Sequence, residues 1–204
     1  MLRPKLSTDL QAARYSPHLV TVVHRHFGEI DRHAIFSAFL TALDAGGFDE
    51  IDFIRTAGSS FNPRPARTGL ILINDARVRD AEIVSAGILS AIGKPLAAKV
   101  SQDFTARVNE LVTVSLLPAS DLLNRPELPS AVAQIAGSRF LDRARHIHQA
   151  PPSHQRSIAN ALIAEAEALE RLTMGVSGPL YLLIRAWRER FPARLDRLRG
   201  EFKE

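Results

Sequence analysis

The fold of this chain is decided by RDAEIVSAGILSAIGKP, residues 79–95. Asp80 is a good N-cap for a helix, because its carboxylate can accept hydrogen bonds from the first backbone N–H groups. The apolar residues that follow occupy nearly all sides of a helix instead of one stripe, and a helix of that kind is buried. We therefore predict a central core helix over residues 81–92. Its apolar positions are Ile83, Val84, Ala86, Gly87, Ile88 and Ile92.

Composition favours a helical protein. The chain has 204 residues, of which 46% are hydrophobic, so it can bury one sizeable core. Aromatic residues make up only 6%, and Ala, Leu, Ile and Arg dominate, which favours helices over a sheet. The chain has no cysteine, which excludes disulfides, thiolate metal ligands and cysteine nucleophiles.

No targeting or membrane segment is expected. The N-terminal MLRPKLSTDLQAARY lacks the apolar core of a signal peptide, and no run approaches the roughly 18 apolar residues of a membrane span. We therefore expect a soluble, cytoplasmic protein with no membrane partner. Its net charge of +4 is compatible with a phosphate-rich partner but does not require one.

The first half of the chain reads as a series of short helices. Residues 17–27 are ambiguous, because their run of Val and Thr also suits a strand. Asp31 can cap a helix that continues to about Ala45 and ends at Gly46-Gly47. A short helix over residues 48–57 and a loop at GSSFNPRP precede a compact apolar helix over residues 66–76.

The second half has clearer helical spacing. We predict a helix over residues 104–115 that is stopped before Pro118, and another over residues 131–149. Ser153 can cap the next helix, and the break at residues 175–178 precedes the final one. The predicted architecture is an irregular all-α, multi-helix bundle. It forms one globular unit, with residues 1–48 as a helical extension packed on a core of residues 49–204.

Three segments carry a resemblance to a known family. They are RPARTGLILI from Arg64, RDAEIVSAGILSAIGKP from Arg79 and FLDRARHIHQAPPSHQRSIANAL from Phe140. Their order and spacing resemble the HD-domain hydrolase module of the RelA/SpoT family, which cleaves the bacterial alarmone (p)ppGpp. The resemblance covers roughly two-thirds of the chain. It implies an HD-domain-like bundle in a bacterial, cytoplasmic protein.

The family holds a divalent metal with His and Asp side chains, and this chain departs from that pattern. Arg64 stands where the family has the His of a His-Pro pair, and Ser90-Ala91 replaces His-Asp. Lys94-Pro95 replaces the acidic pair that activates water, whereas Asp142 persists. One carboxylate cannot hold a cation against water, so we predict that hydrolysis is lost and expect no cofactor.

The resemblance also implies a vacated metal pocket. Because Arg forks suit phosphate oxygens, this pocket is a candidate site for a phosphorylated nucleotide or another small anion. The competing structural interpretation is that these charges lie at helix ends, and that Asp142 forms an ion pair within its own helix with Arg145 or His146. The candidate pocket residues are Arg64, Arg67, Ser90, Lys94, Asp142 and Arg145.

Two other functions stay open. The first is an active metal-dependent phosphohydrolase that uses manganese or another divalent metal, with relocated ligands such as His24, His26 or His146. His24 and His26 share a face only on a strand, so this site is weak. The second is a structural or interaction protein in which residues 1–48 supply a partner or homodimer surface. We do not expect a nucleic-acid partner, because the Arg-rich final helix is the one feature in its favour.

Overall fold

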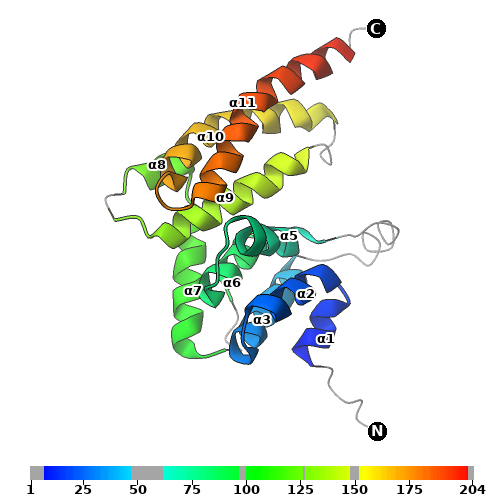
Figure 1. Cartoon of the computed structure of the whole chain (residues 1–204), viewed down its shortest axis with the longest axis vertical. Helices are drawn as coiled ribbons and strands as arrows, with labels where there is room; N and C mark the ends of the chain where they lie inside the picture. Colours follow the sequence, from blue (N-terminus) through cyan, green and yellow to red (C-terminus); the bar gives the residue numbers. More distant parts are fainter. Residues whose placement is uncertain (1–6, 47–61, 97–99, 126, 148–151, 202–204) are drawn as a thin grey trace. The chain divides into compact units, whose positions relative to one another are not determined.

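The fold is all-α, as predicted. The computed structural model describes residues 7–46, 62–96, 100–125, 127–147 and 152–201, and every regular element among them is a helix (Figure 1). No helix in these ranges has the length and apolar character needed to cross a membrane. The short helix predicted over residues 48–57 lies outside the described residues.

Contacts divide the chain into two compact units, Met1–Leu116 and Leu117–Glu204. This boundary falls inside the segment that the sequence prediction assigned to one domain. In unit 1 the helices are α1 (Thr8–Ala13), α2 (Pro17–His26), α3 (Glu29–Ala45), α5 (Arg64–Leu70), the π-helix η1 (Ile71–Asp75), α6 (Ala81–Ser90) and α7 (Gln102–Ser115). In unit 2 they are α8 (Ala119–Leu123), α9 (Ser130–Arg145), α10 (Pro152–Thr173) and α11 (Gly178–Glu201).

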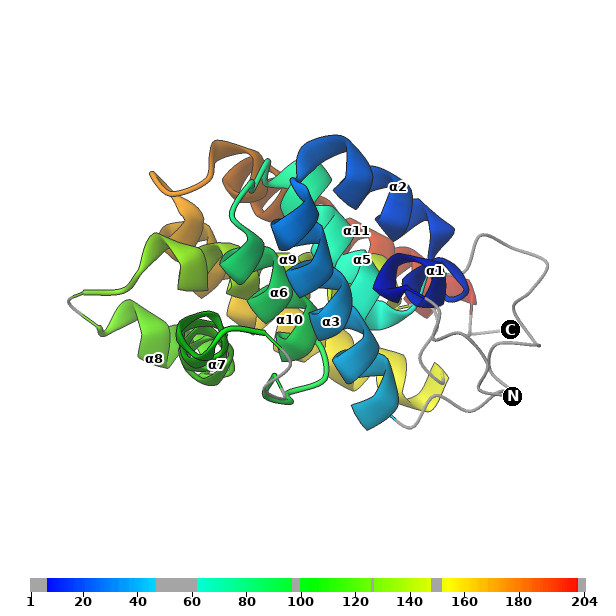
Figure 2. The same cartoon turned by 90° about the horizontal axis from the view of Figure 1, so that it is seen from below.

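The centre of unit 1 is α6, the helix predicted to be the core. It packs against α3, α5 and α7, and Figure 2 shows α3 and α6 side by side with α7 viewed nearly end-on. Eight of its ten residues are buried. The helix ends at Ser90, two residues earlier than predicted. Within unit 1, the helix α3 packs extensively on α6.

Two glycines let α5 and α6 approach closely. A Cβ atom on Gly87 would lie 2.1 Å from Cδ1 of Leu72, and one on Gly69 would lie 2.9 Å from Cγ1 of Ile88. Both distances are inside van der Waals contact, so a larger residue at either position forces the buried side chain of Leu72, in η1, or of Ile88 to shift.

Side-chain caps explain where α1, α2, α6 and α7 begin. Asp80 caps α6, as predicted, by accepting hydrogen bonds from the N–H groups of Glu82 (2.8 Å) and Ile83 (3.3 Å). The ambiguous segment is the helix α2, because Ser16 caps it and Pro17 occupies its first turn. Buried Leu19, Val22 and Val23 then follow helical spacing.

Two predicted caps are wrong. The N-cap of α3 is Gly28, and the helix begins at Glu29, so Asp31 lies in its first turn. A carboxylate there still favours the helix through its dipole. Similarly, α10 begins at Pro152, which places Ser153 inside the helix.

The predicted helix over residues 66–76 is interrupted. It begins as α5 and continues as the π-helix η1, after which Arg77 adopts a left-handed conformation with φ of 58°. The Arg79 guanidinium fixes this turn by donating hydrogen bonds to the carbonyl oxygens of Ile73 (2.7 Å) and Val78 (2.8 Å). The wider π turn and the sharp bend bring Asp80 to the start of α6.

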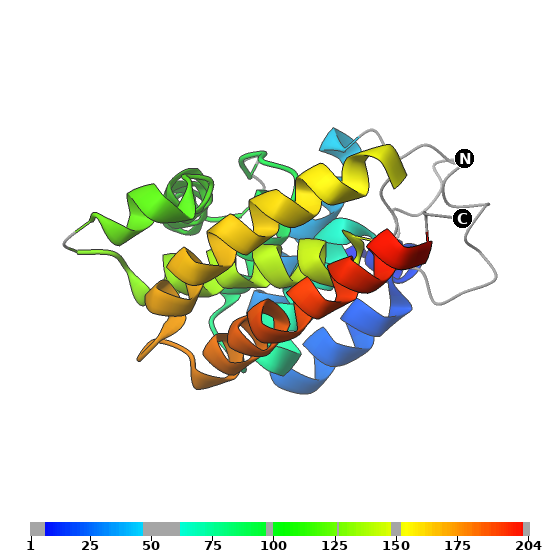
Figure 3. The same cartoon turned by 90° about the horizontal axis from the view of Figure 1, so that it is seen from above.

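In unit 2, α9, α10 and α11 run side by side (Figure 3), and α8 packs on α10. On α10, Leu162, Ala166 and Leu169 follow helical spacing and are buried. On α11, Trp187 stacks on Phe191 with ring centroids 4.4 Å apart, and its edge meets Phe140 of α9 at 5.1 Å. These rings join the final helix to the helix that carries Asp142.

Candidate functional site

The six predicted pocket residues fall in both units. Arg64, Arg67, Ser90 and Lys94 belong to unit 1, and Asp142 and Arg145 belong to unit 2. Each group is therefore described within its own unit. The prediction that they share one pocket stays a prediction.

Ser90 has a local structural role at the end of α6. Its buried hydroxyl donates a hydrogen bond of 2.9 Å to the carbonyl oxygen of Gly87, in its own helix. A serine in this position offers a neutral oxygen where an HD site requires imidazole or carboxylate. Ser90 therefore stabilises the fold here and is a poor metal ligand.

Lys94 follows a helix-terminating motif. The N–H of Gly93 bonds the carbonyl oxygen of Ser90 at 3.3 Å, and the N–H of Lys94 bonds that of Leu89 at 3.4 Å. With Gly93 at φ of 68°, this pattern is a Schellman motif, and the following Pro95 cannot continue the helix. The Lys94 side chain is exposed, and its charge suits the negative end of the α6 dipole.

Asn109 of α7 holds the segment that follows Lys94. Its side-chain Oδ1 accepts a hydrogen bond from the N–H of Leu96 at 2.6 Å, and its Nδ2 donates to the Leu96 carbonyl oxygen at 3.3 Å. The amide thus pairs with both backbone groups of a residue that is itself buried. Sequence reasoning missed Asn109, because no spacing pattern signals a side chain that bonds a distant backbone.

Arg64 and Arg67 lie at the start of α5. Arg64 is the first residue of the helix and is exposed, and Pro65 occupies the next position, where its missing N–H costs nothing. Arg67 donates from Nη1 to the backbone carbonyl of Asn62 at 3.1 Å. The hydroxyl of Ser16 donates to Oδ1 of Asn62 at 2.6 Å, so the approach to α5 is also tied to α2.

Asp142 is buried in α9, with 1% of its surface exposed. His146, one turn later, places Nδ1 at 2.7 Å from the Asp142 carbonyl oxygen and at 3.3 Å from the carboxylate Oδ1. Because a carbonyl oxygen can only accept, Nδ1 carries the hydrogen. His146 and Asp142 are therefore in contact, and the ion pair of the competing interpretation stays a prediction, because His146 is charged only when protonated.

The neighbour of Asp142 joins α9 to α10. Arg143 places Nη2 at 2.7 Å from both carboxylate oxygens of Glu165. Both side chains are partly buried, so this pair is stronger than an exposed ion pair. It keeps the helix that carries Asp142 in register with α10.

His24 and His26 are the alternative metal ligands that lie in unit 1. Nε2 of His24 faces Oδ2 of Asp9 at 2.9 Å, and its Nδ1 faces Nη1 of Arg32 at 3.0 Å, so both ring nitrogens have protein partners. The pKa of His26 is lowered by loss of hydration and then by the charges of Arg79 and Arg25. Within the part of the chain that the structure describes, no three His, Cys, Asp or Glu side chains are grouped so as to hold a metal ion.

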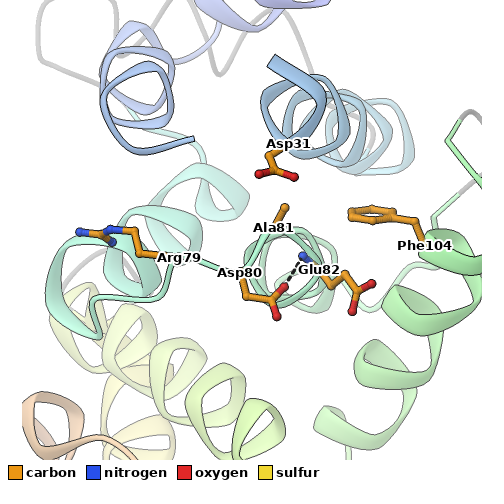
Figure 4. Close-up of a pocket in the computed structure, with 6 residues that line it drawn as sticks. All are labelled: Asp31, Arg79, Asp80, Ala81, Glu82 and Phe104. Carbon is orange, nitrogen blue, oxygen red and sulfur yellow. Dashed lines mark hydrogen bonds between the residues drawn. The ribbon is translucent and has the colours of Figure 1, made fainter. Parts of the chain in front are cut away.

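A solvent-open hollow of about 370 Å³ lies at the start of α6 (Figure 4). Three carboxylates line it, from Asp31 of α3 and from Asp80 and Glu82, together with Arg79 and Phe104. The pKa of Glu82 is raised, first by burial and then by the charge of Asp80, and the charge of Arg107 opposes this shift. Because Arg107 also lies 3.8 Å from Glu82, the charge around the hollow is mixed.

The sequence shows the residues that line this hollow, but it does not show that they lie close together in space. Asp31 and Asp80 stand out as potential caps, 49 positions apart in the sequence, and the packing of α3 on α6 brings them together. No family model, curated protein or solved structure matches this chain significantly.

Proposed function

We propose that this protein is a catalytically degenerate HD-like module that binds a phosphorylated nucleotide or another small anion as a regulatory domain, without hydrolysing it. The observation that carries the proposal is the chemistry at the family's ligand positions. Arg64, Ser90 and Lys94 replace groups that would hold or assist a metal ion. The proposal therefore assigns ligand binding to positions whose residues no longer suit a metal-dependent hydrolase.

The local geometry supports this choice of residues. Arg64 and Lys94 are exposed at the ends of their helices, so their charges can reach a ligand in solution. Ser90 has its hydroxyl bonded within α6 and adds no negative charge. An exposed cationic side chain favours phosphate oxygens over a metal ion, because like charges repel.

Equilibrium dialysis with radiolabelled guanosine tetraphosphate tests the proposal. We expect the wild-type chain to bind, and Arg64→Ala and Lys94→Ala each to weaken binding by about tenfold, the value of one charge-assisted hydrogen bond. Arg171→Ala is the matched control, because Arg171 is exposed and pairs with Glu167 in its own helix at 2.9 Å. Absence of binding, or equal binding by all three variants and wild type, would overturn the proposal.

A further inference from the structure

The first helix, α1, is held to unit 1 by little apolar contact. It packs on α2 and α3, and Ala12 is its one buried residue. Its leucine, Leu10, points outward with 57% of its surface exposed. Since burial of apolar surface is the main source of stability for a short helix, α1 gains less from packing than its neighbours do.

Polar contacts supply the rest of the attachment. Asp9 of α1 meets Nε2 of His24 at 2.9 Å, and Thr8 meets Nδ1 of His33 at 3.1 Å. The guanidinium of Arg32 can only donate, so Nδ1 of His24 accepts from it and Nε2 donates to Asp9. His24 of α2 therefore contacts both Asp9 of α1 and Arg32 of α3. These side chains are substantially exposed, and exposed contacts of this kind are weak.

From these contacts we propose that α1, residues 8–13, is a displaceable strap. It opens from α2 and α3 while the rest of unit 1 stays folded, and the Asp9–His24 contact sets how often it opens. Opening releases His24 from Asp9 and His33 from Thr8, so the surface beneath the strap becomes accessible. Elements that move for regulation come from the least stable parts of a fold, and α1 meets that condition. This inference does not depend on the proposed ligand.

The chain contains a closely matched control helix. α7 begins with Ser101-Gln102-Asp103-Phe104, and α1 begins with Ser7-Thr8-Asp9-Leu10. In both helices the serine hydroxyl oxygen accepts a hydrogen bond of 3.4 Å from the backbone N–H three residues later. The backbone N–H groups of Gln11 and Thr105 donate hydrogen bonds of 3.0 Å to the carbonyl oxygens of Ser7 and Ser101, respectively. The two first turns thus share capping and dipole effects. The helices differ in packing and in length, since α1 has 6 residues and α7 has 14, so the effect of Asp9→Asn is the decisive comparison.

Amide hydrogen exchange of the full chain, followed by NMR, tests the strap. We expect the Gln11 amide to exchange at least about tenfold faster than that of Thr105. Asp9→Asn should increase the exchange rate of the Gln11 amide by a further two- to fivefold, roughly the effect of losing one exposed ion pair. The exchange rates of the α3 amides should not change. Asp103→Asn should affect Thr105 less, because it removes the first-turn charge alone.

Two results would overturn the proposal. In the first, Gln11 exchanges as slowly as Thr105, which would mean that α1 opens only with the whole unit. In the second, Asp9→Asn accelerates Gln11 no more than Asp103→Asn accelerates Thr105, which would mean that the His24 contact does not hold the strap. His24→Ala gives an independent reading, since it should match Asp9→Asn and add nothing when the two are combined.

Discussion

At the scale of single residues, the predicted pocket positions have structural roles that their sequence context explains. Ser90 bonds its own helix, and Lys94 follows the glycine that ends it. Arg64 is the first residue of α5 and precedes Pro65. These roles leave the side chains of Arg64 and Lys94 exposed and do not conflict with the proposed ligand binding.

Arg77 carries a conformational cost that can be measured. Its φ of 58° is unfavourable for a side chain with a Cβ atom, and the side chain is exposed. We expect Arg77→Gly to raise the free energy of unfolding by up to about 1 kcal/mol in urea titrations. Arg14→Gly is the control, because Arg14 has φ of −65° at the end of α1 and glycine should destabilise there. A loss of stability in Arg77→Gly would contradict the assigned backbone strain.

His26 makes the stability of the fold depend on pH. Its pKa is lowered in the folded state from 6.5, so folding disfavours the charged imidazole. The free energy of unfolding is therefore not reduced by His26 well above pH 6.5. It decreases as the pH falls through 6.5 toward the lowered pKa that His26 has in the folded state. In urea titrations, the free energy of unfolding should decrease more between pH 7.5 and pH 5.5 for wild type than for His26→Gln. Equal losses would refute this assignment.

At the scale of elements, the sequence was informative wherever a local signal decided the outcome. Asp80 caps α6 as predicted, and the all-round apolar pattern of that helix does mean burial. The π turn of η1 was not predictable, because it depends on how Leu72 packs against α6 and on the bonds of Arg79. For the same reason the hollow that contains Asp31 and Glu82 requires knowledge of which helices meet.

The close crossing of α5 and α6 predicts a strong packing effect. Gly87→Ala should lower the free energy of unfolding by about 1–3 kcal/mol, because its Cβ meets the fully buried Leu72 side chain. Gly178→Ala serves as the control, since nothing lies within 4 Å of its Cβ position. Thermal or urea unfolding measures both. Equal stability of Gly87→Ala and wild type would contradict the packing described.

The backbone clamp of Asn109 gives a second prediction for an element. Asn109→Ala leaves both backbone groups of Leu96 without their partner, so we expect a loss of about 1–3 kcal/mol in stability. Thr113→Ala, one turn further along α7 and exposed, should change stability by less than about 0.5 kcal/mol. If Asn109→Ala behaved like Thr113→Ala in urea titration, the clamp would not contribute to stability.

At the scale of the whole molecule, contacts divide the chain into two compact units with a boundary at Leu116–Leu117. Contacts between helices distant in sequence set such a boundary, and composition does not record them. The candidate residues are distributed over both units. The proposed function therefore rests on the chemistry of the residue types at these positions in the sequence.

The most direct test of the central claim is release of labelled pyrophosphate from guanosine tetraphosphate by the full-length protein with added manganese. We expect the ligand to be bound and recovered intact, with no pyrophosphate release above a protein-free blank. Asp142 is the one carboxylate at the positions that the resemblance assigns to a metal site, and one carboxylate cannot hold the cation that hydrolysis needs. Sustained pyrophosphate release that depends on manganese and is abolished by Asp142→Ala would contradict it.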